Sequence, residues 1–164
     1  MAINRGKDFE KIIRDSFLKV PDTSATRLHD QTNGFMGSAN PCDFIVYHKP
    51  YLYAIECKSV HGNTLPLSNI SKFQWQSLLD MSKVKGVISG VICWWIDKDV
   101  TAFIPIQELE ECKRAGYKSV RSDHESFTID GFINISGKKK RVFFEYNMND
   151  FFNTTRIAYE RNTI

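Results

Sequence analysis

Residues 43–58 read Asp-Phe-Ile-Val-Tyr-His-Lys-Pro-Tyr-Leu-Tyr-Ala-Ile-Glu-Cys-Lys, and this stretch decides the predicted fold. Two runs rich in β-branched and aromatic residues flank the turn-forming sequence His48-Lys49-Pro50, which predicts a β-hairpin. A turn centred between Lys49 and Pro50 fixes the alignment of the two strands. It predicts three opposed pairs: Tyr47 with Leu52, Ile45 with Ala54, and Asp43 with Glu56.

The opposed carboxylates of Asp43 and Glu56 are the unusual feature of this hairpin. Directly opposed residues have Cβ atoms ~5 Å apart, and like charges placed so are destabilising unless a cation lies between them. Lys58 follows Glu56 by two residues and therefore projects from the same face. Two carboxylates and a lysine on one face suit a divalent metal ion with a water molecule beside it. The alternative is an ordinary buried hairpin whose charges lie at its open end.

Length and composition indicate one folded domain. The chain has 164 residues, of which 42% are hydrophobic and 13% aromatic, and this is enough to bury a core. We expect a single domain over residues 1–164, with its core at about 5–115 and a C-terminal hairpin and tail at 116–164. The net charge of +3 permits nucleic-acid binding through local patches but does not require it.

The cysteines and the apolar segments predict a cytoplasmic protein. The four cysteines form neither a C-x-x-C pair nor a zinc-binding spacing, so we expect buried, reduced thiols. Residues 1–7 lead into a charged helix, and we expect no signal peptide there. The longest apolar run, Val87–Ile96, is too short to span a bilayer.

The order of predicted elements indicates an α/β (α+β) fold with a mixed sheet flanked by helices. Hydrophobic periodicity and capping residues predict the elements around the hairpin: a helix from Arg5 that Pro21 closes, a short strand at Ala25–His29, a helix from a cap at Ser68 or Asn69 to Lys85, strands at Val87–Ile96 and Val100–Ile104, and a helix at Ile106–Ala115. Beyond these, we expect a hairpin of Phe127–Ser136 and Arg141–Met148 with a basic tip, then a short helix or tail at Asn149–Ile164.

Several other chemistries are excluded by what the sequence lacks. The four histidines, at positions 29, 48, 61 and 124, have no metal-binding spacing, which argues against a zinc hydrolase. The chain has no G-x-S-x-G, no P-loop and no G-x-G-x-x-G motif. What is left is a site of oxygen ligands for a hard cation, which suits Mg²⁺ or Mn²⁺ and phosphate chemistry.

The order of these polar residues resembles the signature of the PD-(D/E)XK nuclease superfamily. Within it, the chain looks like the Holliday junction resolvases of the archaeal Hjc and bacterial RecU types, in a phage or prophage version. The resemblance covers roughly residues 5–105 and rests on Glu10, Gly37-Ser38, Asp43, Glu56-Cys57-Lys58 and Gln74. The usual Pro-Asp pair reads Pro41-Cys42-Asp43 here. The resemblance implies a restriction-endonuclease-like sheet flanked by helices.

The resemblance also implies roles for individual residues. Asp43 and Glu56 would bind Mg²⁺ or Mn²⁺, with Glu10 and the backbone carbonyl of Cys57 as further ligands. Lys58 would orient or help to deprotonate the attacking water, and Gln74 would sit beside this strand. The residues alone leave two alternatives open: a surface ion pair of Glu10 with Lys7 or Arg14, and a half-exposed helical position for Gln74.

For the substrate, the resemblance implies branched DNA that a homodimer cuts at a four-way junction, in recombination and repair in a bacterial host cell. Arg27 could bind a phosphate, and Ser38 matches a serine near the scissile phosphate. Lys138, Lys139 and Lys140 could contact the DNA backbone. Simpler readings are a flexible loop around Ser38 and a solvated basic turn. Two other functions also fit: a restriction-like endonuclease, and a non-catalytic protein that binds branched DNA.

Overall fold

The computed structural model describes residues 5–28, 39–123, 131–161 and 164. Its helices are α1 (Arg5–Phe17), α2 (Lys72–Ser82), α3 (Ile106–Arg114) and α4 (Met148–Glu160), with 3-10 turns η1 (Leu67–Asn69) and η2 (Ile96–Lys98). Its strands are β1 (Thr23–Arg27), β2 (Phe44–His48), β3 (Tyr51–Val60), β4 (Thr64–Pro66), β5 (Val87–Trp95), β6 (Val100–Pro105), β7 (Ser119–Arg121), β8 (Ile133–Asn134), β9 (Gly137–Lys139) and β10 (Phe144–Tyr146).

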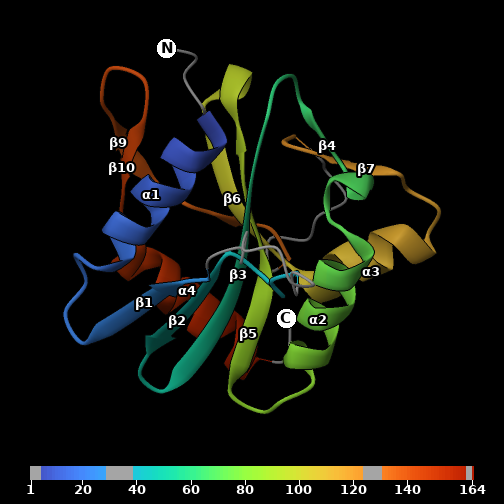
Figure 1. Cartoon of the computed structure of the whole chain (residues 1–164), viewed down its shortest axis with the longest axis horizontal. Helices are drawn as coiled ribbons and strands as arrows, with labels where there is room; N and C mark the ends of the chain where they lie inside the picture. Colours follow the sequence, from blue (N-terminus) through green and yellow to red (C-terminus); the bar gives the residue numbers. More distant parts are fainter. Residues whose placement is uncertain (1–4, 29–38, 124–130, 162–163) are drawn as a thin grey trace, which may run out of the picture.

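The centre of the fold is a mixed sheet with the order β1-β2-β3-β5-β6-β8 (Figure 1). β3 and β5 run parallel, whereas the other neighbouring strands pair antiparallel. α1 and α4 pack on one face of the sheet, and α2 and α3 pack on the other. The predicted class, an α+β fold whose mixed sheet is flanked by helices, is therefore confirmed.

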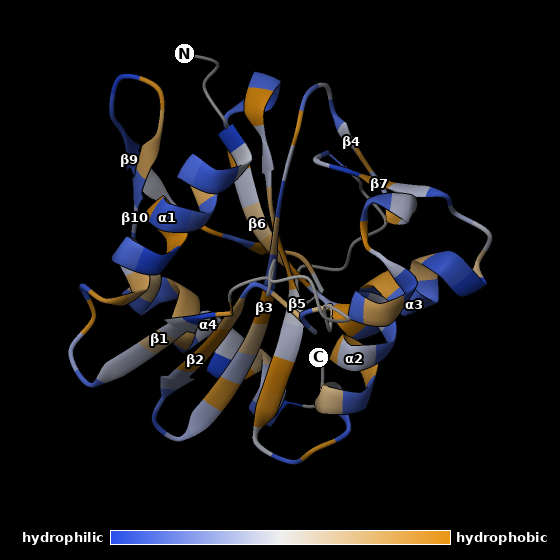
Figure 2. Cartoon of the chain, viewed as in Figure 1, coloured by the Kyte–Doolittle hydropathy of each residue, from blue (hydrophilic) through white to orange (hydrophobic). Residues whose placement is uncertain are grey.

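The hydrophobic core lies on both faces of the sheet, so the central strands are apolar on both sides. Figure 2 shows hydrophobic residues along these strands and hydrophilic residues on the visible side of α1. β5 is buried from Ile88 to Trp95, as its continuous apolar run predicted. Gly90 lets β6 approach closely, because a Cβ atom there would lie 2.3 Å from the carbonyl oxygen of Ile104.

The hairpin at the centre of the prediction has the predicted register. β2 and β3 are antiparallel, and Tyr47 pairs with Leu52 and Ile45 with Ala54. The backbone N–H of Asp43 donates to the carbonyl of Ile55 at 3.1 Å, which extends the ladder one step beyond β2. Asp43 and Glu56 are therefore opposed at the open end of the hairpin.

The bounds of several elements differ from the prediction. Ser68 and Asn69 lie in η1, and the N-cap of α2 is Ser71. α2 ends at Ser82 and not at Lys85, α1 ends at Phe17, and β1 spans Thr23–Arg27. Ser68, Asn69 and Ser71 are all residue types that cap helices. Ser71 is the one that caps α2, because it forms a capping box with Gln74.

The C-terminal hairpin has a basic turn, but this turn lies further along the chain than predicted. Lys138 and Lys139 lie within β9, which pairs with β10, and the backbone N–H of Lys140 bonds to the carbonyl of Phe143 at 2.7 Å to close the turn. The turn therefore spans residues 140–143 and contains Lys140 and Arg141. Of the segment predicted as the first strand, residues 127–130 lie outside the described residues, and Ile133–Asn134 forms β8 at the edge of the central sheet.

The chain ends in a core helix and not in a polar tail. α4 buries Phe151 and Phe152 against Phe17 and Tyr53, with ring centroids 5.2 to 5.7 Å apart. All four cysteines are free thiols. Within the part of the chain that the structure describes, no helix is long and apolar enough to cross a membrane.

Candidate active site

Glu56 is a carboxylate in the core, on the β3 face that α2 covers. The residue is 1% exposed, and its Oε1 accepts hydrogen bonds from Lys58 Nζ at 2.7 Å and from Gln74 Nε2 at 2.8 Å. Its Oε2 is buried and has no hydrogen-bond partner among the described residues. A buried polar atom without a partner is costly, so this oxygen is a candidate ligand atom.

Asp43 faces Glu56 from just before β2, and its position is fixed by the backbone around it. Its Oδ2 accepts from the N–H of Cys57 at 2.8 Å, and its carbonyl accepts from the N–H of Leu28 at 2.8 Å. In a strand, the N–H and C=O of one residue point to the same side. The carbonyl of Cys57 therefore points toward the Asp43 side of β3, where it was predicted to act as a ligand.

Burial raises the pKa of both carboxyl groups. The pKa of Glu56 rises to about 7, first because of burial and then because of the charge of Asp43, and Lys58 offsets only part of this rise. Burial raises the pKa of Asp43 to about 6, against the hydrogen bond from the Cys57 N–H. The two groups disfavour each other's ionised form, and a bound cation would relieve this repulsion.

Gln74 is held in place through both polar atoms of its side-chain amide. It is the N3 residue of α2, and it forms a capping box with Ser71: its backbone N–H donates to Ser71 Oγ at 3.2 Å, and its amide oxygen accepts from the Ser71 N–H at 3.1 Å. The amide oxygen is thus occupied, so the amide NH₂ is directed at Glu56. The sequence analysis missed Ser71, although the Ser-x-x-Gln spacing is itself the signature of a capping box.

Glu10 lies near the carboxylate pair but is paired with a cation. Its Oε2 accepts from Arg27 Nη2, and its charge contributes to the raised pKa of Asp43 and of Glu56. The Nε of Arg27 is buried without a partner among the described residues. Of the two alternative partners, Arg14 pairs with Asp15 at 2.8 Å.

The donor set fits a divalent cation only in part. Among the described residues, no group of three or more His, Cys, Asp or Glu side chains is placed to hold a metal ion. Two opposed carboxylates, an unpartnered Oε2 and a backbone carbonyl are nevertheless the hard oxygen ligands that Mg²⁺ and Mn²⁺ prefer. The thiol of Cys57 is no competing ligand, because burial raises its pKa well above the ordinary value.

The three lysines predicted to contact DNA lie apart from this site. Ser38 is outside the described residues. Lys138, Lys139 and Lys140 lie on or directly after β9, beside α1 (Figure 1). Lys139 pairs with Asp99, and Lys140 pairs with Glu145 at 3.0 Å, so two of the three charges are engaged by acids within the chain.

Comparisons with known proteins show a likeness to solved structures. No family model matches the sequence, and no curated protein matches it. Among solved structures, the chain is similar to Hjc, a Holliday junction resolvase from the archaeal hyperthermophile Archaeoglobus fulgidus. The two are 23% identical with a TM-score of 0.47, and the match covers 62% of this chain and 78% of that one.

Proposed function

We propose that this protein is a metal-dependent, structure-selective DNA endonuclease that resolves four-way junctions in recombination or repair. The observation that carries the proposal is the state of Glu56. It is a buried carboxylate that faces Asp43, holds Lys58 and Gln74 on one oxygen and has no partner for the other oxygen within the described part of the chain. Such a group contributes little to a stable core, but it matches what phosphodiester hydrolysis requires.

Asp43 and Glu56 would hold Mg²⁺ or Mn²⁺, with the Cys57 carbonyl and Glu10 as further ligands. When bound, the ion supplies Lewis-acid stabilisation of the negative charge that develops on the phosphate. Arg27 holds Oε2 of Glu10 and therefore competes with a metal ion for this carboxylate. A DNA phosphate that binds Arg27 would release Glu10, which links substrate binding to completion of the site.

Lys58 has two roles in the proposed reaction. Its ammonium group lies 2.7 Å from Glu56 Oε1, where it can orient a water molecule and offset charge on the phosphate. Water attacks the phosphorus in line and gives up one proton to solvent, the bond from phosphorus to the 3′ oxygen breaks, and the 3′ oxygen takes a proton from solvent. The products are a 5′-phosphate and a 3′-hydroxyl. Gln74 keeps the carboxylate of Glu56 in place throughout.

The proposed substrate has consequences for assembly and location. A four-way junction has two-fold symmetry, and paired nicks need two active sites, so a homodimer is the simplest assembly. The free thiols suit a reducing compartment such as the cytoplasm of a bacterial host cell, where a phage or prophage version would act.

The test is cleavage of a labelled synthetic four-way junction beside a linear duplex built from the same arms. Each substrate is incubated with Mg²⁺ or with EDTA, and the Glu56→Gln variant serves as the control for a contaminating nuclease. Paired symmetric nicks in the junction alone, only with Mg²⁺, are the expected result. Equal cutting of both substrates would instead indicate a restriction-like nuclease. Tight junction binding without cleavage in Mg²⁺ or Mn²⁺ would indicate a structural DNA-binding protein.

A further inference from the structure

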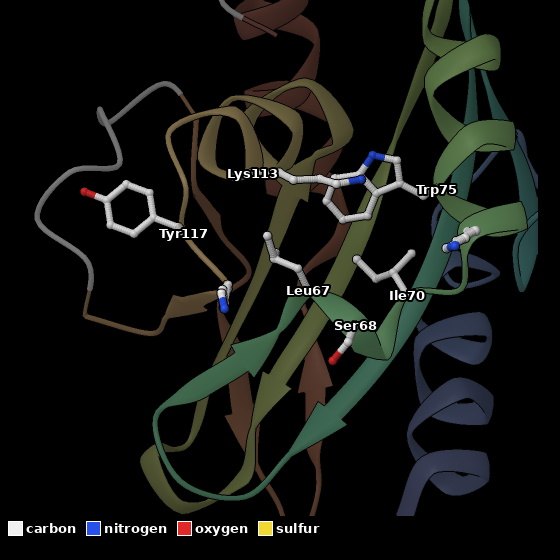
Figure 3. Close-up of a pocket in the computed structure, with 8 residues that line it drawn as sticks. Leu67, Ser68, Ile70, Trp75, Lys113 and Tyr117 are labelled. Atoms are coloured by element: carbon white, nitrogen blue, oxygen red, sulfur yellow. The ribbon is translucent and has the colours of Figure 1, made fainter.

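A cavity lies at the N-terminal end of α2, outside the carboxylate site. Its volume is about 380 Å³, and it lies between η1, α2 and the end of α3 (Figure 3). Pockets that hold small organic ligands measure roughly 300–1,000 Å³, so this one has room for a single small group. The residues that line it are Leu67, Ser68, Ile70, Lys72, Trp75, Lys113, Tyr117 and Lys118.

The floor of the cavity is apolar and includes an indole ring. Leu67 and Ile70 are buried, and in Figure 3 their side chains rise toward the place where Trp75 and Lys113 meet. The indole N–H of Trp75 donates to Glu110 at 2.7 Å, which fixes the orientation of the ring. Such a surface suits a planar aromatic group better than a chain of aliphatic carbons.

The rim of the cavity is positively charged. Lys72 and Lys118 are exposed and form no ion pair among the described residues, and Lys113 lies over the Trp75 ring with Nζ 4.5 Å from its centroid. Glu110 is the nearby acid, and it pairs with Arg114 at 3.2 Å. A ligand that carries a negative charge beside a planar ring therefore matches both the rim and the floor.

The cavity is also next to the candidate active site along the chain. Trp75 directly follows Gln74, whose amide holds Glu56. The first turn of α2 thus separates the carboxylates from the cavity. A DNA strand bound at the carboxylates can therefore reach the cavity with a neighbouring nucleotide.

We propose that this cavity binds one unpaired nucleotide of branched DNA, with the base on Leu67, Ile70 and Trp75 and the phosphates on the lysines. The proposal rests on the proposed function and names the feature of the substrate that is recognised. A base pair at the branch point of a four-way junction lacks a continuous stacked neighbour, so a base there leaves its pair at a lower cost than a base in a continuous duplex. Aromatic contact with a cationic rim is the general mode of binding for single-stranded nucleic acid.

The test is DNA binding in EDTA, where no cleavage occurs. The probe is a fluorescent splayed-arm DNA, and a second probe carries abasic sites in place of the unpaired nucleotides at the branch. The double variant Lys72→Glu/Lys118→Glu removes the rim charges. Lys85→Glu is the control, because Lys85 is exposed beyond the other end of α2 and forms no ion pair among the described residues. It reverses one charge and the double variant reverses two, so the losses in binding free energy are compared per substituted lysine. Circular dichroism melts check that each variant is folded.

We expect the wild-type protein to bind the abasic probe about tenfold more weakly than the probe with bases. We expect the double variant to lose about tenfold in affinity for the probe with bases, and Lys85→Glu to lose little. Equal binding of the two probes would overturn the proposal, since the cavity would then recognise phosphate alone. Equal losses per substituted lysine in the double variant and in Lys85→Glu would overturn it as well. Because this binding does not need Asp43 or Glu56, a failure of the nuclease proposal would appear separately, as intact binding without cleavage in Mg²⁺.

Discussion

Replacing Glu56 with glutamine is expected to stabilise the fold at alkaline pH while it removes the carboxylate that the proposed reaction needs. Burial and the opposed charge of Asp43 make the ionised form of Glu56 unfavourable in the folded protein. Glutamine has almost the same shape and keeps an oxygen that can accept hydrogen bonds from Lys58 and Gln74. The substitution therefore removes a charge from the core and leaves no cavity.

The magnitude follows from the pKa of Glu56. It rises from an ordinary value of 4.5 to about 7 in the folded protein. Each unit of difference between the folded and unfolded chain is worth about 1.4 kcal/mol, so ionised Glu56 lowers the free energy of unfolding by about 3 kcal/mol above pH 7. Glutamine loses the charge-assisted hydrogen bond from Lys58, which reduces the net gain to roughly 1–2 kcal/mol.

The stability advantage of Glu56→Gln should depend on pH. Because the pKa is raised in the folded state, the penalty is absent below the unfolded pKa of 4.5 and grows as the pH rises to about 7. The stability advantage of Glu56→Gln should therefore be small at about pH 5 and largest at about pH 8. A gain of about 1–2 kcal/mol corresponds to a rise in Tm of roughly 3–6 °C in a chain of this size.

Urea denaturation in EDTA, followed by tryptophan fluorescence, measures this free energy at both pH values. Glu111→Gln is the control, since Glu111 is an exposed glutamate on α3 and the same chemical change there should have little effect at either pH. The reasoning is refuted if the advantage of Glu56→Gln stays flat or shrinks between about pH 5 and about pH 8.

Three further predictions concern the other members of the site. Mg²⁺ should raise the stability of the wild-type protein, by about 2.7 kcal/mol at 100 times its Kd, but not that of Asp43→Asn; equal shifts in thermal melts would place the ion elsewhere. Lys58→Ala should slow single-turnover junction cleavage by about 100-fold or more and also lower the Tm at neutral to alkaline pH, because it leaves the buried Glu56 without its cation, whereas an unaltered rate would remove Lys58 from the mechanism. Gln74→Ala should cost about 1 kcal/mol of stability and also slow cleavage, because it breaks both the capping box and the bond to Glu56. Gln76→Ala, an exposed position on the same helix, should do neither, and similar losses in both variants would reduce the role of Gln74 to helix stability.

The central sheet was predictable because its signals are local. In the hairpin of β2 and β3, the turn sequence and the alternation of side chains act within sixteen residues, and together they fix which residues face each other. The buried strand β5 is a long apolar run that no exposed element could carry. The C-terminal third lacked such signals, since β8, β9 and β10 have only two or three residues each.

For α4 the sequence left a short helix and a tail open, for a different reason. Its buried residues recur at helical spacing, but the Asn and Thr residues between them give the stretch the composition of a tail. The aromatic rings of Phe17 and Tyr53 on the other elements receive this helical face. Tertiary packing, and not local propensity, stabilises a helix of this kind.

The same distinction applies to the candidate site. Asp43, Glu56 and Lys58 belong to one hairpin, and strand alternation alone places them on one face. The pairing of Glu10 with Arg27 depends on how α1 approaches β1, which no local pattern encodes. The orientation of the Gln74 side chain could be predicted only in part. The capping box that orients it is a local feature, but its contact with Glu56 depends on the packing of α2 against the sheet.

The energetics of Glu56 give a reason to seek function at this position and not elsewhere in the core. An apolar side chain on this face of β3 would bury surface without a desolvation cost, whereas the carboxylate faces a second acid and leaves one oxygen without a partner. Every other part of the hairpin agrees with its local preferences: the alternation, the turn and the register all favour the same fold. Glu56 is the one residue of this hairpin that conflicts with its buried position. We infer that function, and not stability, accounts for a carboxylate there. The higher stability of Glu56→Gln and its loss of cleavage would then have the same physical cause, which is the removal of the buried negative charge.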